Sequence, residues 1–228
     1  MRLLIATFIT SFLAAVTAGA QTTLPYDHVH LAAPDQAKAV EWYQQNFGGE
    51  TTSEGKDRLL YGKTRFIWLK SDKAQPSLDT AIDHIAFSVA NRAPGTITDP
   101  WGVKIEILND PERRGFHHVH LNSADPAASI AWYLQRFGGE RAKFKGEDGL
   151  KYGDVLVLVQ KAKSAVIPSA GRALDHIGWR VTNLDKTLED LKGIKVLQGV
   201  TNLQLATGPV RFSFVEDPGG TKIELVQR

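Results

Sequence analysis

The sequence predicts an α+β fold built from four related modules, each beginning with a strand. Two repeats lead to this prediction. Residues 26–50 (YDHVHLAAPDQAKAVEWYQQNFGGE) recur as residues 116–140 (FHHVHLNSADPAASIAWYLQRFGGE). A second pair of segments, residues 81–87 (AIDHIAF) and 173–179 (ALDHIGW), repeats the opening strand of the longer copies. Such regular self-similarity indicates that one supersecondary unit has been copied along the chain.

The first module is predicted to run strand, helix, then two or three strands. Residues 26–31 alternate as a half-buried strand does. Asp35 is a suitable N-cap for the helix that follows. Val40, Tyr43 and Phe47 then share one helix face, and the Gly48-Gly49 pair ends it. Residues 58–61 and 64–69 are predicted to form the next two strands.

The third module repeats this plan with stronger helix signals. Asp125 and Pro126 supply an N-cap and a first-turn proline. Ile130, Tyr133 and Phe137 form the apolar stripe. Residues 150–152 and 155–159 are the corresponding strands, since residues 61–70 and 152–161 align from their Tyr-Gly pairs.

The fourth module is complete and the second is abbreviated. In the fourth, Asn183 is predicted to cap a helix, and residues 208–215 and 221–226 to form a hairpin closed by the turn at 217–220. In the second, the helix and middle strands are missing. The chain passes through residues 91–98 directly to a closing segment, DPWGVKIE, that matches DPGGTKIE of the fourth.

The N-terminal residues read as an export signal. A short basic start, an uncharged apolar run and Ala18-Gly19-Ala20 are typical of a cleavable signal at residues 1–20. The alternative is a membrane anchor, but the run is shorter than the ~20 residues that span a bilayer. We therefore expect a secreted or periplasmic protein with no membrane contact after cleavage. Two domains are predicted, at residues 21–112 and 113–228.

The composition narrows the possible partners. The formal net charge is +2, and cleavage would remove Arg2 and leave +1. There is no basic block to indicate nucleic acid or a membrane surface. The absence of cysteine excludes cysteine nucleophiles, iron–sulfur clusters and thiolate metal sites. We expect a small-molecule substrate and a monomer or homodimer.

Histidines and glutamates recur at fixed module positions. Each opening strand carries a histidine at the same register, and the closing strands of modules two and four carry a glutamate. Two imidazoles and one carboxylate bind a divalent ion and leave positions open for a substrate. One inert histidine copied by duplication would give the same histidine pattern. Grouped by halves of the chain, the predicted metal sites are His28/His84/Glu106 and His118/His176/Glu224.

Two more histidines share the face of these candidates. His30 and His120 lie two residues beyond His28 and His118, so they point to the same side of the strand. They are candidates for a fourth ligand, a supporting partner or a general acid or base, with rim positions as the alternative. His117 alternates to the other face and is interpreted as structural. Arg211 is a candidate contact for an anionic substrate.

These motifs resemble the vicinal oxygen chelate superfamily, which includes glyoxalase I, extradiol dioxygenases and the bleomycin resistance proteins. The resemblance rests on the two long repeats, on LDHIGWRVTNLDKTLEDL and on EDPGGTKIELV. It implies paired βαβββ modules that curl around a metal ion. By position, it implies metal ligands at His118, His176 and Glu224, and likewise at His28, His84 and Glu106.

The chain departs from part of that pattern. Glyoxalases commonly have a further Glu or Gln ligand on the partner module, and the expected positions here hold Phe66 and Val157. This departure favours the three-ligand site of the extradiol dioxygenases, although Phe214 stands where their tyrosine is expected. The leading hypothesis is a metal-dependent dioxygenase with Fe²⁺, or with Zn²⁺, Mn²⁺ or Ni²⁺. The alternatives are a glyoxalase-like lyase or isomerase with His120 as base, and a metal-free drug-binding protein.

Overall fold

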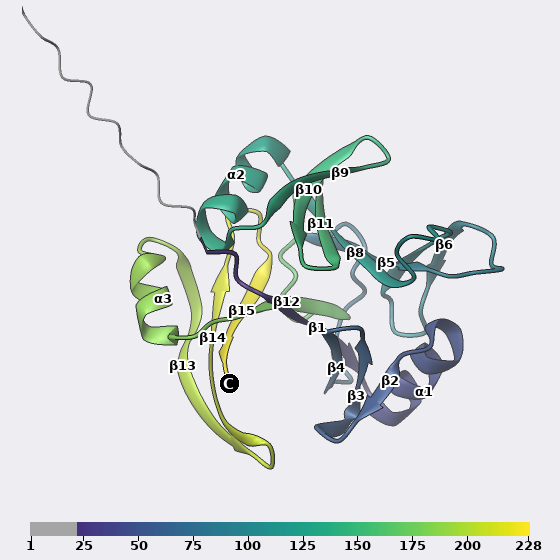
Figure 1. Cartoon of the computed structure of the whole chain (residues 1–228), viewed down its shortest axis with the longest axis horizontal. Coiled ribbons are helices and arrows are strands. Elements are labelled where there is room, and N and C mark those ends of the chain that lie inside the picture. Colours follow the sequence, from purple (N-terminus) through teal and green to yellow (C-terminus); the bar gives the residue numbers. More distant parts are fainter. Residues whose placement is uncertain (1–21) are drawn as a thin grey trace, which may run out of the picture.

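The computed structural model describes residues 22–228, so the predicted signal at residues 1–20 lies outside the described part. The described residues form two mixed sheets with three short helices (Figure 1). Among the described residues, no helix is both long and apolar enough to cross a membrane. In chain order the elements are β1 (Tyr26–Ala33), α1 (Gln36–Phe47), β2 (Glu50–Thr52), β3 (Gly55–Tyr61), β4 (Thr64–Lys70), β5 (Ile82–Ser88), β6 (Gly95–Thr98), β7 (Lys104–Leu108), β8 (Gly115–Ser123), α2 (Pro126–Phe137), β9 (Glu140–Phe144), β10 (Glu147–Tyr152), β11 (Val155–Lys161), β12 (Leu174–Arg180), α3 (Leu184–Asp190), β13 (Lys195–Leu205), β14 (Gly208–Glu216) and β15 (Lys222–Gln227).

The predicted helix boundaries are confirmed. The side chains of Asp35, Asp125 and Asn183 each accept a hydrogen bond from the backbone amide three residues later. Gly48 and Gly138 follow the last residues of α1 and α2 with φ of 73° and 71°. Glycine adopts this backbone conformation without steric cost, so the helices stop there.

Each sheet joins a module from one half of the chain to a module from the other. The eight-stranded sheet has the order β13-β14-β15-β12-β1-β4-β3-β2, and the seven-stranded sheet has β6-β7-β5-β8-β11-β10-β9. The antiparallel pair β1·β12 therefore connects modules one and four, and β5·β8 connects modules two and three. Residues of these central strands that share a sheet face come from distant parts of the sequence.

The aromatic contacts of the helices, in contrast, join modules of the same half of the chain. Tyr43 of α1 donates a hydrogen bond to Asp99, with 2.8 Å between the oxygens. Phe47 stacks on Phe87, with ring centroids 4.3 Å apart. The second half repeats both contacts, as Tyr133 with Asp217 and Phe137 with Trp179. The predicted halves are thus joined internally through their helices and to each other through their sheets.

One strand in the second module and one in the fourth were not predicted. The abbreviated second module lacks a helix between β5 and β7, as expected, but it keeps the short strand β6, which pairs with β7. The fourth module contains the long strand β13, whose residues are mostly exposed. Such a strand has no buried face, so its sequence does not alternate clearly between apolar and polar residues.

Replacing Tyr133 with phenylalanine should destabilise the protein by about 1–3 kcal/mol. Asp217 is buried, and one carboxylate oxygen accepts from the amides of Gly219 and Thr221 while the other accepts from Tyr133 at 2.7 Å. Losing the hydroxyl leaves that second oxygen without this donor. Urea unfolding measures the change. The matched control is Tyr152→Phe, since the buried Tyr152 hydroxyl has no hydrogen-bond partner among the described residues; an equal loss in both variants would contradict the prediction.

Candidate metal centres

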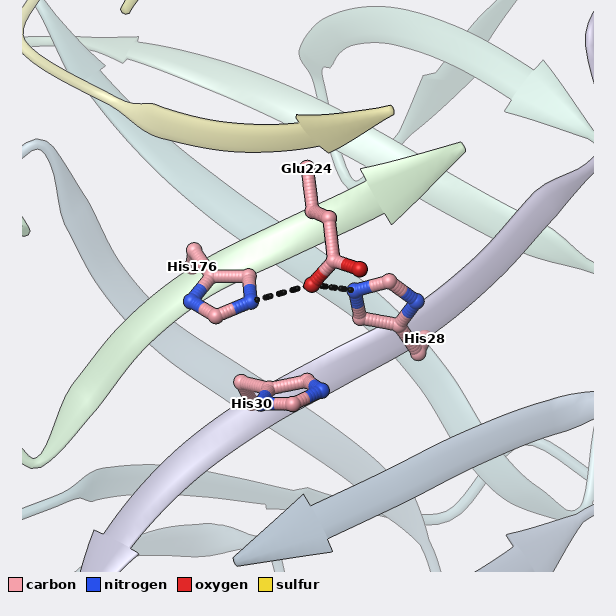
Figure 2. A group of neighbouring side chains, drawn as sticks. All are labelled: His28, His30, His176 and Glu224. Carbon is pink, nitrogen blue, oxygen red and sulfur yellow. Dashed lines mark hydrogen bonds and ion pairs between the residues drawn. The ribbon is translucent and has the colours of Figure 1, made fainter. Parts of the chain in front are cut away.

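The first site lies where modules one and four meet. It consists of His28 and His30 on β1, His176 on β12 and Glu224 on β15 (Figure 2). Each offers one donor atom, and all four atoms lie within 4.8 Å of one another. Glu224 Oε2 lies 3.0 Å from His176 Nε2 and 3.3 Å from His28 Nε2. Three imidazoles and one carboxylate therefore converge on one point.

The second site repeats this arrangement where modules two and three meet. His84 on β5 and His118 and His120 on β8 offer donor atoms within 4.8 Å of one another. Glu106 on β7 completes the set, with Oε2 3.3 Å from His118 Nε2 and 3.6 Å from His84 Nε2. All eight predicted site residues thus lie in two equivalent clusters.

The predicted grouping of these residues by halves of the chain is wrong. His28 lies with His176 and Glu224, rather than with His84 and Glu106. The physical reason is the strand order, because β1 pairs with β12 and β5 pairs with β8. Each half of the chain contributes two histidines from one strand to one site, and a histidine and a glutamate from two strands to the other site.

The predicted register of Phe66 and Val157 with Glu224 is wrong by one residue. Glu224 pairs with the residue two positions beyond the histidine of its module's opening strand. On β4 and β11 the corresponding residues are Ile67 and Leu158. A shift of one residue moves a side chain to the other face of the sheet, so Phe66 packs on the helix side. The conclusion that neither position offers a carboxylate is unchanged.

Buried aspartates orient two imidazoles of the first site. Asp27 Oδ2 lies 2.8 Å from His28 Nδ1, and Asp175 Oδ1 lies 2.5 Å from His176 Nδ1. With Nδ1 engaged, Nε2 of each ring points toward Glu224 (Figure 2). Carboxylates that hold the second nitrogen of a histidine ligand are typical of metal sites. Sequence reasoning missed these aspartates, although each directly precedes its histidine.

The second site supports its imidazoles differently. Asp83 holds His84 Nδ1 at 2.6 Å, but His118 Nδ1 faces His117 Nδ1 at 2.9 Å. The other nitrogen of His117 lies 3.2 Å from Asp110. His117, interpreted from sequence as structural, therefore stands between a predicted ligand and a carboxylate.

Glu147 is a second carboxylate at the second site, and the sequence analysis missed it. It lies on β10, and its carboxylate contacts His120 Nε2. The repeat offers no signal for it, because Lys56 occupies the corresponding place in module one. The two sites therefore share four donors but differ in what surrounds them.

Three of the six imidazoles are in the neutral state that a metal ligand needs. Burial lowers the pKa of His118 to about 4 and, with the charge of His84, that of His120 to about 3. Burial and the charge of His176 hold the pKa of His30 well below its usual range. Burial opposes charge on His28 as well, but Glu224 and Asp27 outweigh it and raise the pKa of His28 to about 9. Three of the six imidazoles are thus neutral near pH 7, and His28 is charged beside Glu224.

The residues of the first site fit a divalent transition-metal ion. His30 Nδ1 is buried and has no hydrogen-bond partner among residues 22–228, and the buried His28 Nε2 has only its contact with Glu224 Oε2 at 3.3 Å. Buried polar atoms without partners are rare, and a bound ion satisfies them. Neutral imidazole and carboxylate donors suit zinc, iron, manganese and nickel.

Arg211, the candidate contact for an anionic substrate, lies outside both sites. It forms a bidentate pair with Asp185 on the surface, with N–O distances of 2.9 Å.

Comparisons with known proteins agree with this geometry. Residues 115–225 match the family model of the Glyoxalase/Bleomycin resistance protein/Dioxygenase superfamily. Glyoxalase I from Zea mays superimposes with a TM-score of 0.65 at 17% identity, covering 90% of this chain and 92% of that one. A putative dioxygenase from Bacillus subtilis gives a TM-score of 0.56 at 15% identity, with 91% and 86% covered. The sequence matches no curated protein. Residues 115–225 therefore form a Glyoxalase/Bleomycin resistance protein/Dioxygenase domain, and the chain as a whole has the fold of these two solved structures.

Proposed function

We propose that this chain is an exported, metal-dependent enzyme that acts on a small substrate with two adjacent oxygen atoms. The observation that supports it is the convergence of three imidazoles and one carboxylate at each of two buried sites. A divalent ion held there would act as a Lewis acid with positions open to the substrate. Fe²⁺ is our leading ion, with Zn²⁺, Mn²⁺ or Ni²⁺ as alternatives.

The protein's own part is to position donors and to accept a proton. Asp27 and Asp175 fix the rings of His28 and His176. His30 stacks on His176, with ring centroids 4.2 Å apart, and its buried Nδ1 has no partner among the described residues. Because burial keeps His30 neutral, this nitrogen has one of two roles: it binds the ion as a fourth donor or, left free of the ion, it takes the proton of a substrate hydroxyl. His120 is the corresponding candidate at the second site.

The leading reaction is extradiol-type ring cleavage at the first site. Ile67 stands where a further carboxylate would be needed for the proton shuttle of a glyoxalase. The test uses residues 21–228, purified anaerobically without a metal-binding tag and loaded with Fe²⁺. We expect oxygen uptake with catechols in an oxygen electrode, and none with Glu224→Ala. A protein that contains no metal and takes up none would contradict the proposal and leave the drug-binding alternative.

A glyoxalase-like lyase or isomerase is the second candidate, and Glu147 favours it at the second site. Its carboxylate lies against His120, and the first site has Lys56 at the equivalent position. There it could move a proton of a bound substrate. With Zn²⁺ or Ni²⁺ and thiol adducts of α-keto aldehydes, Glu147→Gln should lower turnover by ~10²–10⁴-fold without oxygen consumption. Unchanged turnover in this variant would remove the second candidate.

A further inference from the structure

Four arginines gather beside the first site. They are Arg58 on β3, Arg65 on β4, Arg180 at the end of β12 and Arg228 after β15, and we call them the arginine cluster. Arg65 forms a bidentate pair with Glu54, with N–O distances of 2.5 and 2.6 Å. Arg180 donates to Asp27 Oδ1 at 2.8 Å, and Arg228 also contacts Asp27.

Asp27 links this cluster directly to the first site. One of its oxygens accepts from Arg180, and the other lies 2.8 Å from His28 Nδ1. Arg65 pairs with His28 across β1 and β4. Residues Arg180 and Arg228 lie four positions beyond His176 and Glu224, so they extend from the same face of their strands. The cluster therefore borders the metal donors on the side of His28.

The second site has no such cluster among residues 22–228, although equivalent strands build it. By register, the places of the four arginines are taken there by Gly149, Leu156, Ser88 and Asp110. The second site forms the same sheet and the same donor set without these four arginines, although Arg114, from the segment before β8, donates to Ser88 Oγ at 3.4 Å. Support of the fold alone therefore does not account for the arginines.

The cluster also has more cationic groups than its buried acid requires. Asp27 is 1% exposed and accepts from three arginines, whereas one partner would compensate its charge. Counting Glu54 and Asp57, three carboxylates face four guanidinium groups. Each guanidinium has five N–H donors, so donors remain for a ligand. The Arg180 side chain is 40% exposed and is within reach of one.

We propose that the arginine cluster binds a carboxylate of the substrate while its two adjacent oxygens lie at the first site. This inference rests on the proposed function. Guanidinium groups pair with planar carboxylates through two parallel hydrogen bonds. Phe214 pairs with Glu224 across β14 and β15 and lies edge-on to His176, with ring centroids 4.9 Å apart, so an aromatic side chain stands beside the donors. The substrate class is thus an aromatic carboxylic acid with vicinal hydroxyl groups.

The test compares two probes that differ only in the carboxylate, 3,4-dihydroxybenzoate and catechol. Calorimetry on the Zn²⁺-loaded protein avoids turnover. We expect dihydroxybenzoate to bind at least about tenfold more tightly than catechol. In Arg180→Gln and Arg58→Gln this ratio should fall to less than about threefold. Arg211→Gln, which removes a surface arginine paired with Asp185, is the control and should keep the full ratio.

The ratio of the two affinities separates recognition of the carboxylate from damage to the fold, because catechol has no carboxylate and reports only on binding at the metal donors. If both probes bind equally to the wild type, the inference is wrong while the proposed function stands. If the protein takes up no metal, the proposed function fails. If the metal-free protein still binds dihydroxybenzoate and Arg180→Gln loses that binding, the inference about the arginine cluster is supported. If the metal-free protein does not bind dihydroxybenzoate, the inference is overturned.

Discussion

Replacing Glu224 with alanine should lower the metal content from about two ions per chain to about one. Glu224 is the only carboxylate among the four first-site donors, and it contacts both His28 and His176. Without it, the remaining donors are neutral or protonated imidazoles, which hold a divalent ion far less tightly. Elemental analysis after dialysis against a limited excess of Zn²⁺ measures the change.

Glu106→Ala is the matched variant, because Glu106 occupies the same place at the second site. It should remove the other ion, and the two changes together should remove both. A Glu224→Ala protein that keeps two ions would show that this carboxylate is not a ligand.

A double variant separates the observed grouping from the one predicted by sequence. In the structure, His118 and Glu224 belong to different sites. Glu224→Ala combined with His118→Ala should therefore abolish both sites. Had each half of the chain formed its own site, the same two changes would damage only one. One retained ion in the double variant would thus contradict the cross-half arrangement.

The sequence pointed to all eight clustered residues because their signal is local. A histidine at one register of each opening strand, and a glutamate in each closing DPxGxxIE segment, can be read from the repeat itself. The helix caps at Asp35 and Asp125 are local in the same way. Each of these features depends on residues a few positions apart, so aligning the copies was sufficient.

The partners of each donor could not be read in this way. Four similar modules can pair in several ways, and the repeat is equally consistent with sites within halves or across them. The choice follows from the β1·β12 and β5·β8 pairings, which join segments far apart in the chain. Glu147 and Arg180 were missed for the opposite reason. They stand where the copies differ, and comparing copies emphasises what they share.

Gly178→Ala should destabilise the protein and empty the first site. Gly178 pairs with His28 across β1 and β12. A Cβ at this position would lie 2.1 Å from Cε1 and 2.2 Å from Nε2 of His28. The ring cannot easily withdraw, because Asp27 holds Nδ1 and His30 lies edge-on with its ring centroid 4.7 Å away. Alanine therefore either displaces the ring from the donor set or separates the two strands.

We expect a loss of about 1–3 kcal/mol in unfolding free energy, as for other overpacked cores, and loss of about one metal ion per chain. The control comes from the second site, where Ala86 pairs with His118 and already carries the methyl group. Ala86→Gly should keep both ions and cost only the ~0.5–1 kcal/mol of a glycine in a strand. Thermal unfolding and elemental analysis of both variants measure these effects. A Gly178→Ala protein with two bound ions would mean that His28 is not a ligand, because its imidazole cannot occupy the observed position beside that methyl group.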